Sequence, residues 1–178
     1  EKANVYDTAF HDLLQEHAFL LINTARRSID SSAAFSDSKT ALQNNIEEVA
    51  AQISIIYGTD AGHQFSNLWN NKINNIIAYT DAVKNGDLTA NSTFYSNMAI
   101  YEENSANWWS KLNPEINKAM IRQSITEHVN NVKQAVDFWE AKDYSNYFSK
   151  LHDSYTQIGD YADIIVTGIV KQHPELFE

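Results

Sequence analysis

Residues 113–143 read NPEINKAMIRQSITEHVNNVKQAVDFWEAKD, and this stretch decides the fold. Apolar residues recur in it every three or four positions, which is the period of one face of an α-helix. Asn113 and Pro114 are typical of an N-cap and a first helical position, and Asp143 predicts the cap of the next helix. The stripe contains an imidazole among its apolar members, which are Ile116, Met120, Ile121, Ile125, His128, Val132, Ala135, Val136 and Trp139.

Part of this stretch has an earlier copy in the chain. Lys72-Ile-Asn-Asn-Ile is followed fifteen residues later by Asp87, just as His128-Val-Asn-Asn-Val is followed fifteen residues later by Asp143. His17, Lys72 and His128 begin comparable helical stretches at intervals of 55 and 56 residues. This spacing predicts a two-helix unit that occurs three times.

The helical period holds along the whole chain, with polar or glycine-containing breaks between six segments. The sequence therefore predicts an all-α fold of six helices, paired as three antiparallel helical hairpins in an up-down bundle. The hairpins span roughly residues 4–57, 59–112 and 114–173, within a single domain of residues 1–178. A chain of this length can bury enough surface to fold without disulfides or a metal.

Composition argues against several classes of function. The absence of Cys rules out disulfides, thiolate metal sites and a cysteine nucleophile. The net charge of −10 argues against binding to nucleic acid or to an anionic membrane surface, because both need clustered Lys and Arg. We expect no membrane insertion, because no apolar run approaches the ~20 residues that span a bilayer. Common motifs of nucleophilic, phosphate-binding and zinc sites are missing, which favours a non-catalytic protein.

Two features predict a secreted or cell-surface bacterial protein. The chain begins at Glu1 without Met, as it would after removal of a signal peptide. It also contains 19 Asn against 13 Lys plus Arg, a polar but weakly charged composition that suits an extracellular surface. A cytosolic protein trimmed at its N-terminus would give the same start.

Three basic residues are the strongest candidates for function, because His17, Lys72 and His128 each interrupt an apolar stripe. The predicted return helices carry acids at comparable places, each two residues after an isoleucine, namely Glu48, Glu102 and Asp160. We therefore expect a buried cluster of His, Lys and carboxylate side chains, to which Glu16, Glu103 and Glu127 also belong. An unpaired buried imidazole costs about 1–3 kcal/mol, so a structural hydrogen bond would account for each His without a ligand. Lys72 could instead extend its ammonium to solvent along its stem.

A metal-binding helical bundle is the alternative function, with facing His and carboxylate side chains around a transition metal ion. Its ligands would be His17, His128, Glu48, Glu102 and Asp160. Proton transfer by the histidines is a third interpretation. Glu16 and His17 are adjacent and diverge by about 100° on a helix, so they cannot easily bind one ion together. Lys72 in the same space also disfavours a cation.

Aromatic residues indicate a candidate binding surface. Trp108 and Trp109 are adjacent on one predicted helix, so they cannot both face the same core. One of them, together with Tyr101 and Tyr95, would suit a carbohydrate, a protein partner or self-association. Packing inside the core is the other interpretation.

Two short motifs carry a resemblance to known sequences. They are Tyr57-Gly58-x-x-Ala61-Gly62 followed by Leu68, and Gly168-Ile169-x-Lys171-Gln172-x-Pro174-x-x-Phe177. With Glu16-His17 and Glu127-His128, they resemble a family of uncharacterised, exported all-helical proteins of Gram-positive bacteria. The resemblance implies export and an all-α fold, and it implies no activity. In that family the Lys72 position is often His and acids lie near the positions of Ala99 and Ile100, so a metal site implied there would be incomplete in this chain.

Overall fold

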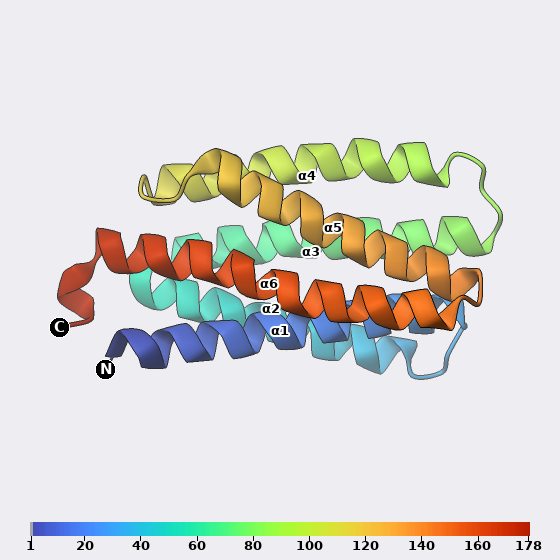
Figure 1. The fold of residues 1–178 in the computed structure, drawn as a ribbon, viewed down its shortest axis with the longest axis horizontal. Helices are drawn as coiled ribbons and strands as arrows, with labels where there is room; N and C mark the ends of the chain where they lie inside the picture. The colour runs from blue at the N-terminus through green and yellow to red at the C-terminus, as the bar shows by residue number, and fades with distance from the viewer. Residues whose placement is uncertain (1) are drawn as a thin grey trace.

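A computed structural model describes residues 2–178 and contains six long α-helices followed by one short 3-10 turn (Figure 1). The helices are α1 (Lys2–Ile29), α2 (Phe35–Tyr57), α3 (Thr59–Lys84), α4 (Ala90–Leu112), α5 (Lys118–Glu140) and α6 (Tyr144–Gln172), and the turn η1 is Pro174–Leu176. Both chain ends lie at the same end of the bundle. The predicted all-α fold with six helices in three antiparallel hairpins is confirmed.

The helices are arranged as an inner triangle with three outer members. α1, α3 and α5 each contact the other two, and α2, α4 and α6 lie outside them. Each outer helix packs against two inner ones: α2 against α1 and α3, α4 against α3 and α5, and α6 against α5 and α1. A hairpin repeated three times around a common axis gives this pattern. Equivalent positions on the first helix of each hairpin therefore converge at the centre.

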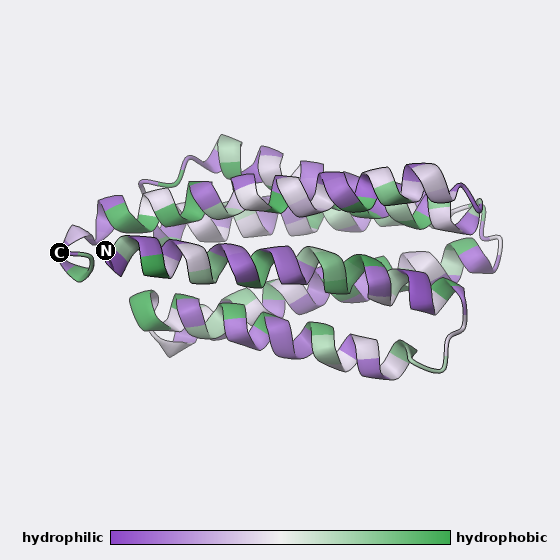
Figure 2. Cartoon of the chain, turned by 60° about the horizontal axis from the view of Figure 1, so that its bottom comes forward, coloured by the Kyte–Doolittle hydropathy of each residue, from purple (hydrophilic) through white to green (hydrophobic). Residues whose placement is uncertain are grey.

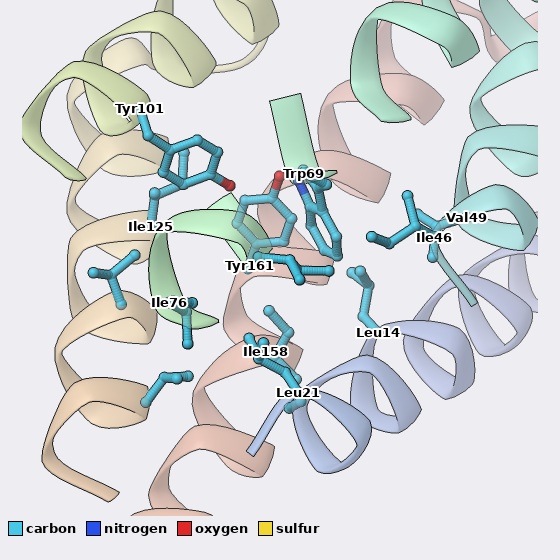
Figure 3. Close-up of a cluster of buried hydrophobic side chains, with 14 of the residues drawn as sticks. Leu14, Leu21, Ile46, Val49, Trp69, Ile76, Tyr101, Ile125, Ile158 and Tyr161 are labelled. Atoms are coloured by element: carbon cyan, nitrogen blue, oxygen red, sulfur yellow. The ribbon is translucent and has the colours of Figure 1, made fainter. Parts of the chain in front are cut away.

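The core between these helices is apolar and draws on all six. Figure 3 shows Leu14 and Leu21, Ile46 and Val49, Trp69 and Ile76, Tyr101, Ile125, Ile158 and Tyr161 meeting from the six helices, and each is less than 5% exposed. Removing one such side chain from water contributes about 1.5–3 kcal/mol. Hydrophobic and hydrophilic residues alternate along the helices in Figure 2, as expected for helices with one buried face. No helix within residues 2–178 has the length and apolarity to cross a bilayer.

The start of α5 differs from the prediction. Asn113 and Pro114 belong to a turn, and Asn117 is the N-cap, with its side chain accepting hydrogen bonds from the amides of Ala119 and Met120 at 2.9 and 3.1 Å. The third hairpin therefore begins its first helix at Lys118 instead of residue 114. Met120, which the stripe placed in the core, is 56% exposed.

Burial of Ile116 explains this difference. Ile116 is 2% exposed, and a Cβ added at Gly168 would lie 2.5 Å from its Cγ1 atom, so the turn packs directly onto α6 at a glycine. Asn113 is fully buried in the turn, where it accepts from the Glu115 amide at 2.8 Å and donates to the Tyr57 hydroxyl at 2.8 Å.

Two other helix boundaries follow the sequence. Gly58 alone connects α2 to α3, and its φ of 86° is a conformation that glycine adopts without a steric penalty. Asp143 is the N-cap of α6 and accepts from the Asn146 amide at 3.3 Å. A single residue thus joins the first hairpin to the second, and a short turn ending at Asp143 joins the two helices of the third hairpin.

Candidate functional site

Three basic side chains meet at the centre of the inner triangle. His17 of α1, Lys72 of α3 and His128 of α5 are 0%, 1% and 3% exposed. The Lys72 Nζ atom lies 3.0 Å from His17 Nε2, and the centroids of the two imidazole rings are 6.3 Å apart. Their regular spacing along the chain places them at matching positions of the three inner helices, which is why they meet.

Asn45 of α2 determines which nitrogen of His17 carries a hydrogen. The Asn45 amide nitrogen donates to the Leu13 carbonyl at 2.9 Å and to Glu16 at 3.2 Å, so its Oδ1 atom faces His17 Nδ1 at 3.2 Å. His17 Nδ1 must therefore be the donor, which leaves Nε2 as an acceptor for Lys72. A second proton on His17, at Nε2, would place its N–H donor against the donor hydrogens of the Lys72 ammonium. This pair consequently holds one positive charge at most.

His128 is less completely paired. Its Nδ1 atom lies 3.4 Å from the Ser154 hydroxyl, and its Nε2 atom is buried without a hydrogen-bond partner among residues 2–178. A small enclosed cavity adjoins it, lined by Trp69, Lys72, Tyr101, Ile125, His128, Val129, Ile158 and Tyr161. The cavity volume is about 10 Å³, which is room for one water-sized particle.

Burial governs the protonation of the cluster. It lowers the pKa of Lys72 from 10.5 to about 7. Burial and then repulsion from Lys72 lower the pKa values of His17 and His128 well below 6.5. No carboxylate contributes to these shifts within the described chain. The nearest compensation for the Lys72 ammonium is the ring of Trp69, whose centroid lies 3.7 Å from Nζ.

The predicted acids do not join the bases. Glu48 and Asp160 are exposed, and Glu102 is half-buried, with its carboxylate accepting from the Thr126 hydroxyl at 2.8 Å. The expectation that an acid on each return helix faces a base is therefore wrong. The three remaining members of the expected cluster also lie at the surface: Glu16 contacts Asn45, Glu127 accepts from Gln123, and Glu103 pairs with Lys118 and Arg122.

Helix geometry explains why this expectation fails. Ile46 and Ile158 point inward, with 0% and 1% exposure, and a residue two positions later is rotated by about 200° around the helix. Glu48 and Asp160 therefore face solvent. On α4 the inward residue is Tyr101, whereas Ile100 is 63% exposed.

The five predicted metal ligands are likewise not gathered. In residues 2–178 only Asp7, His11 and Asp163 bring three ligand atoms within 4.8 Å of one another. His11 Nε2 lies 3.4 Å from Asp7 and 3.1 Å from Asp163. Sequence reasoning missed this group. The four-residue spacing of Asp7 and His11 was visible, but the third member comes from α6, 152 residues from His11.

The four aromatic residues separate into different environments. Trp109 is 1% exposed and donates from Nε1 to the Tyr161 hydroxyl at 2.8 Å, so it belongs to the core. Tyr95 is 52% exposed and lies near Lys133, away from the other three. Trp108 and Tyr101 line a groove of about 500 Å³ between α3 and α4. Its other lining residues are Gln64, Asn67, Leu68, Asn71, Ile100 and Asn104.

Comparison of the chain with protein-family models, with curated proteins and with solved structures finds no match. The resemblance to an exported family of Gram-positive bacteria therefore stays a prediction.

Proposed function

We propose that this chain is an exported, non-catalytic binding protein whose groove between α3 and α4 takes a neutral carbohydrate. The observation that carries the proposal is the lining of that groove. Four of its eight lining residues are amides, two are aromatic, two are aliphatic and none is charged. Export rests on the polar composition, with 19 Asn against 13 Lys plus Arg.

The chemistry of this lining matches a sugar. An amide side chain both donates and accepts hydrogen bonds, which pairs it with neighbouring hydroxyl groups. Indole and aliphatic side chains offer apolar surface to the C–H face of a pyranose ring. Trp108 is held in position because its Nε1 atom donates to Gln64 Oε1 at 2.8 Å. The groove volume also falls in the ~300–1,000 Å³ range of small-molecule sites.

The positions of the amides support a site that follows the helix axes. Gln64, Asn67 and Asn71 recur at three- and four-residue intervals and so occupy one face of α3. Asn104 and Trp108 are four residues apart on α4 and face them. A linear oligosaccharide lying along the groove would meet an amide at each helical turn.

Calorimetric titration with neutral tetrasaccharides tests the proposal, using chitotetraose, cellotetraose and maltotetraose. We expect at least one of them to bind with a Kd between about 10 µM and 1 mM, which corresponds to roughly −7 to −4 kcal/mol. Trp108→Ala should weaken binding at least tenfold. Trp139→Ala is the matched control, because Trp139 is also half-buried but bonds Asp30 outside the groove. Absence of binding by all three sugars, or a protein-only interaction through Trp108, would refute a carbohydrate ligand.

Metal binding is a second candidate function, and the group that favours it is Asp7, His11 and Asp163. The group offers two carboxylates and one imidazole whose ligand atoms lie within 4.8 Å of one another. Divalent transition metals accept such a ligand set. Elemental analysis of untagged protein after loading with Zn²⁺ tests it. The candidate is supported if the wild type retains about one equivalent of Zn²⁺ and Asp163→Asn retains none. It is refuted if the wild type retains less than about a tenth of an equivalent.

A further inference from the structure

The cavity beside His128 is lined by hydrogen-bond donors. Tyr161 accepts from Trp109 Nε1 at 2.8 Å and also bonds Trp69. An indole N–H can only donate, so neither contact uses the hydrogen of the Tyr161 hydroxyl. Tyr101 also has its hydroxyl in this region, and Figure 3 shows the two phenol oxygens directed into the same space. Lys72 adds an amine, of which one hydrogen is directed at His17. None of the residues that line the cavity is acidic.

His128 contributes another donor when its hydrogens are placed to satisfy the most groups. If the Ser154 hydroxyl donates to Nδ1, only Nε2–H stays unpaired. If Nδ1 donates instead, the Ser154 hydrogen and the Nε2 lone pair both stay unpaired. The first arrangement leaves one unsatisfied group in place of two, and it directs an N–H at the cavity. Leaving such a group unpaired is costly in a protein interior.

We propose that this cavity binds one monatomic anion of the halide class, held by Lys72 and His128 with the hydroxyls of Tyr101 and Tyr161. A cation is disfavoured because the lining has no carboxylate to neutralise it. A water molecule fits less well, because it must donate two hydrogens and the lining offers donors. Sulfate and phosphate exceed the space for one water-sized particle.

Tyr101 connects the cavity to the surface. Its side chain lines both the internal cavity and the groove between α3 and α4, so it forms the wall that separates them.

Protonation and anion binding are linked at this site. The titratable groups that line it are Lys72 from α3, Tyr101 from α4, His128 from α5 and Tyr161 from α6. His17 of α1 contacts Lys72 and is contacted in turn by the uncharged Asn45 of α2. Protonation gives His17, Lys72 and His128 a positive charge, which attracts an anion. Tyr101 and Tyr161 are neutral when protonated. The anion should accordingly bind more tightly as pH falls from 9 to 6.

Thermal unfolding in sodium chloride and in sodium gluconate at equal ionic strength tests the proposal. We expect chloride to raise Tm by about 3–6 °C at pH 6, with a smaller rise at pH 9. Lys72→Met should abolish the difference between the two salts, and His128→Leu should reduce it. Lys133→Met is the matched control, because Lys133 is also buried but pairs with Asp137 at 2.7 Å, and it should keep the wild-type response.

A direct measurement completes the test. Crystals soaked in bromide should show an anomalous peak among Lys72, His128, Tyr101 and Tyr161. The proposal is overturned if no peak lies there, or if Lys72→Met responds to chloride as the wild type does. Trp108→Ala should leave the chloride response unchanged, so failure of the carbohydrate proposal and failure of this one can be told apart.

Discussion

Replacing Lys72 by Met should stabilise the protein at neutral pH and remove part of the dependence of its stability on pH. Folding lowers the pKa of Lys72 from 10.5 to about 7, so between these values the unfolded chain binds one proton more than the folded chain. The wild-type free energy of unfolding therefore rises by about 1.4 kcal/mol per pH unit across this window. The cost of burying Lys72 is absent above pH 10.5 and complete below pH 7, where it amounts to about 5 kcal/mol.

The net gain from Lys72→Met is smaller than this cost. Met fills a similar space without an amine, but it leaves His17 Nε2 without its donor, and an unpaired buried acceptor costs about 1–3 kcal/mol. We expect the variant to be more stable than wild type by about 2–4 kcal/mol at pH 7. Above pH 9 the ammonium cost fades while the lost hydrogen bond remains, so the two stability curves should cross.

Urea unfolding followed by far-UV circular dichroism at pH 7, 8, 9 and 10 in sodium gluconate measures both curves. Gluconate keeps halides out of the comparison. Lys133→Met is the control. Burial lowers the pKa of Lys133, but bonding to Asp137 and Tyr79 outweighs it and leaves the pKa raised, so losing these contacts should destabilise the protein at each pH. Parallel curves for wild type and Lys72→Met would refute the idea that Lys72 is buried as a largely uncharged base.

Three other predictions concern named side chains. Gly62→Ala should destabilise the protein by more than about 2 kcal/mol, because the new Cβ would lie 2.6 Å from the backbone carbonyl oxygen of Ala50. Gly159→Ala has its nearest atom at 3.7 Å and should be neutral or gain up to ~1 kcal/mol. Equal urea midpoints for the two variants would contradict this. Asn117→Ala should cost about 1 kcal/mol by removing the cap of α5, and an unchanged midpoint would argue that the helix begins at Pro114. Stability should fall below pH 6.5 by about 1.4 kcal/mol per pH unit for each buried imidazole, and His128→Leu should lose one of these two contributions.

The periodicity of the chain was sufficient to predict the six helices, their pairing and the burial of three bases. Each of these features depends on residues within a few turns of one another. An apolar stripe at a 3.6-residue period defines which face of a helix avoids water, and His17, Lys72 and His128 lie within such stripes. Their meeting also follows from sequence, because a regular repeat brings equivalent positions together.

Only the tertiary structure decided what surrounds those bases. The partners of the bases come from the outer helices, with Asn45 of α2 beside His17 and Ser154 of α6 beside His128, and their positions depend on how each outer helix fits between two inner ones. The outward position of Glu48 and Asp160, by contrast, already follows from the helical period. The groove between α3 and α4 and the group of Asp7, His11 and Asp163 likewise depend on contacts between different helices. A side chain's neighbour across a helix interface is set by packing, which a local pattern does not encode, and so the sequence predicted an acid where the fold supplies a cavity.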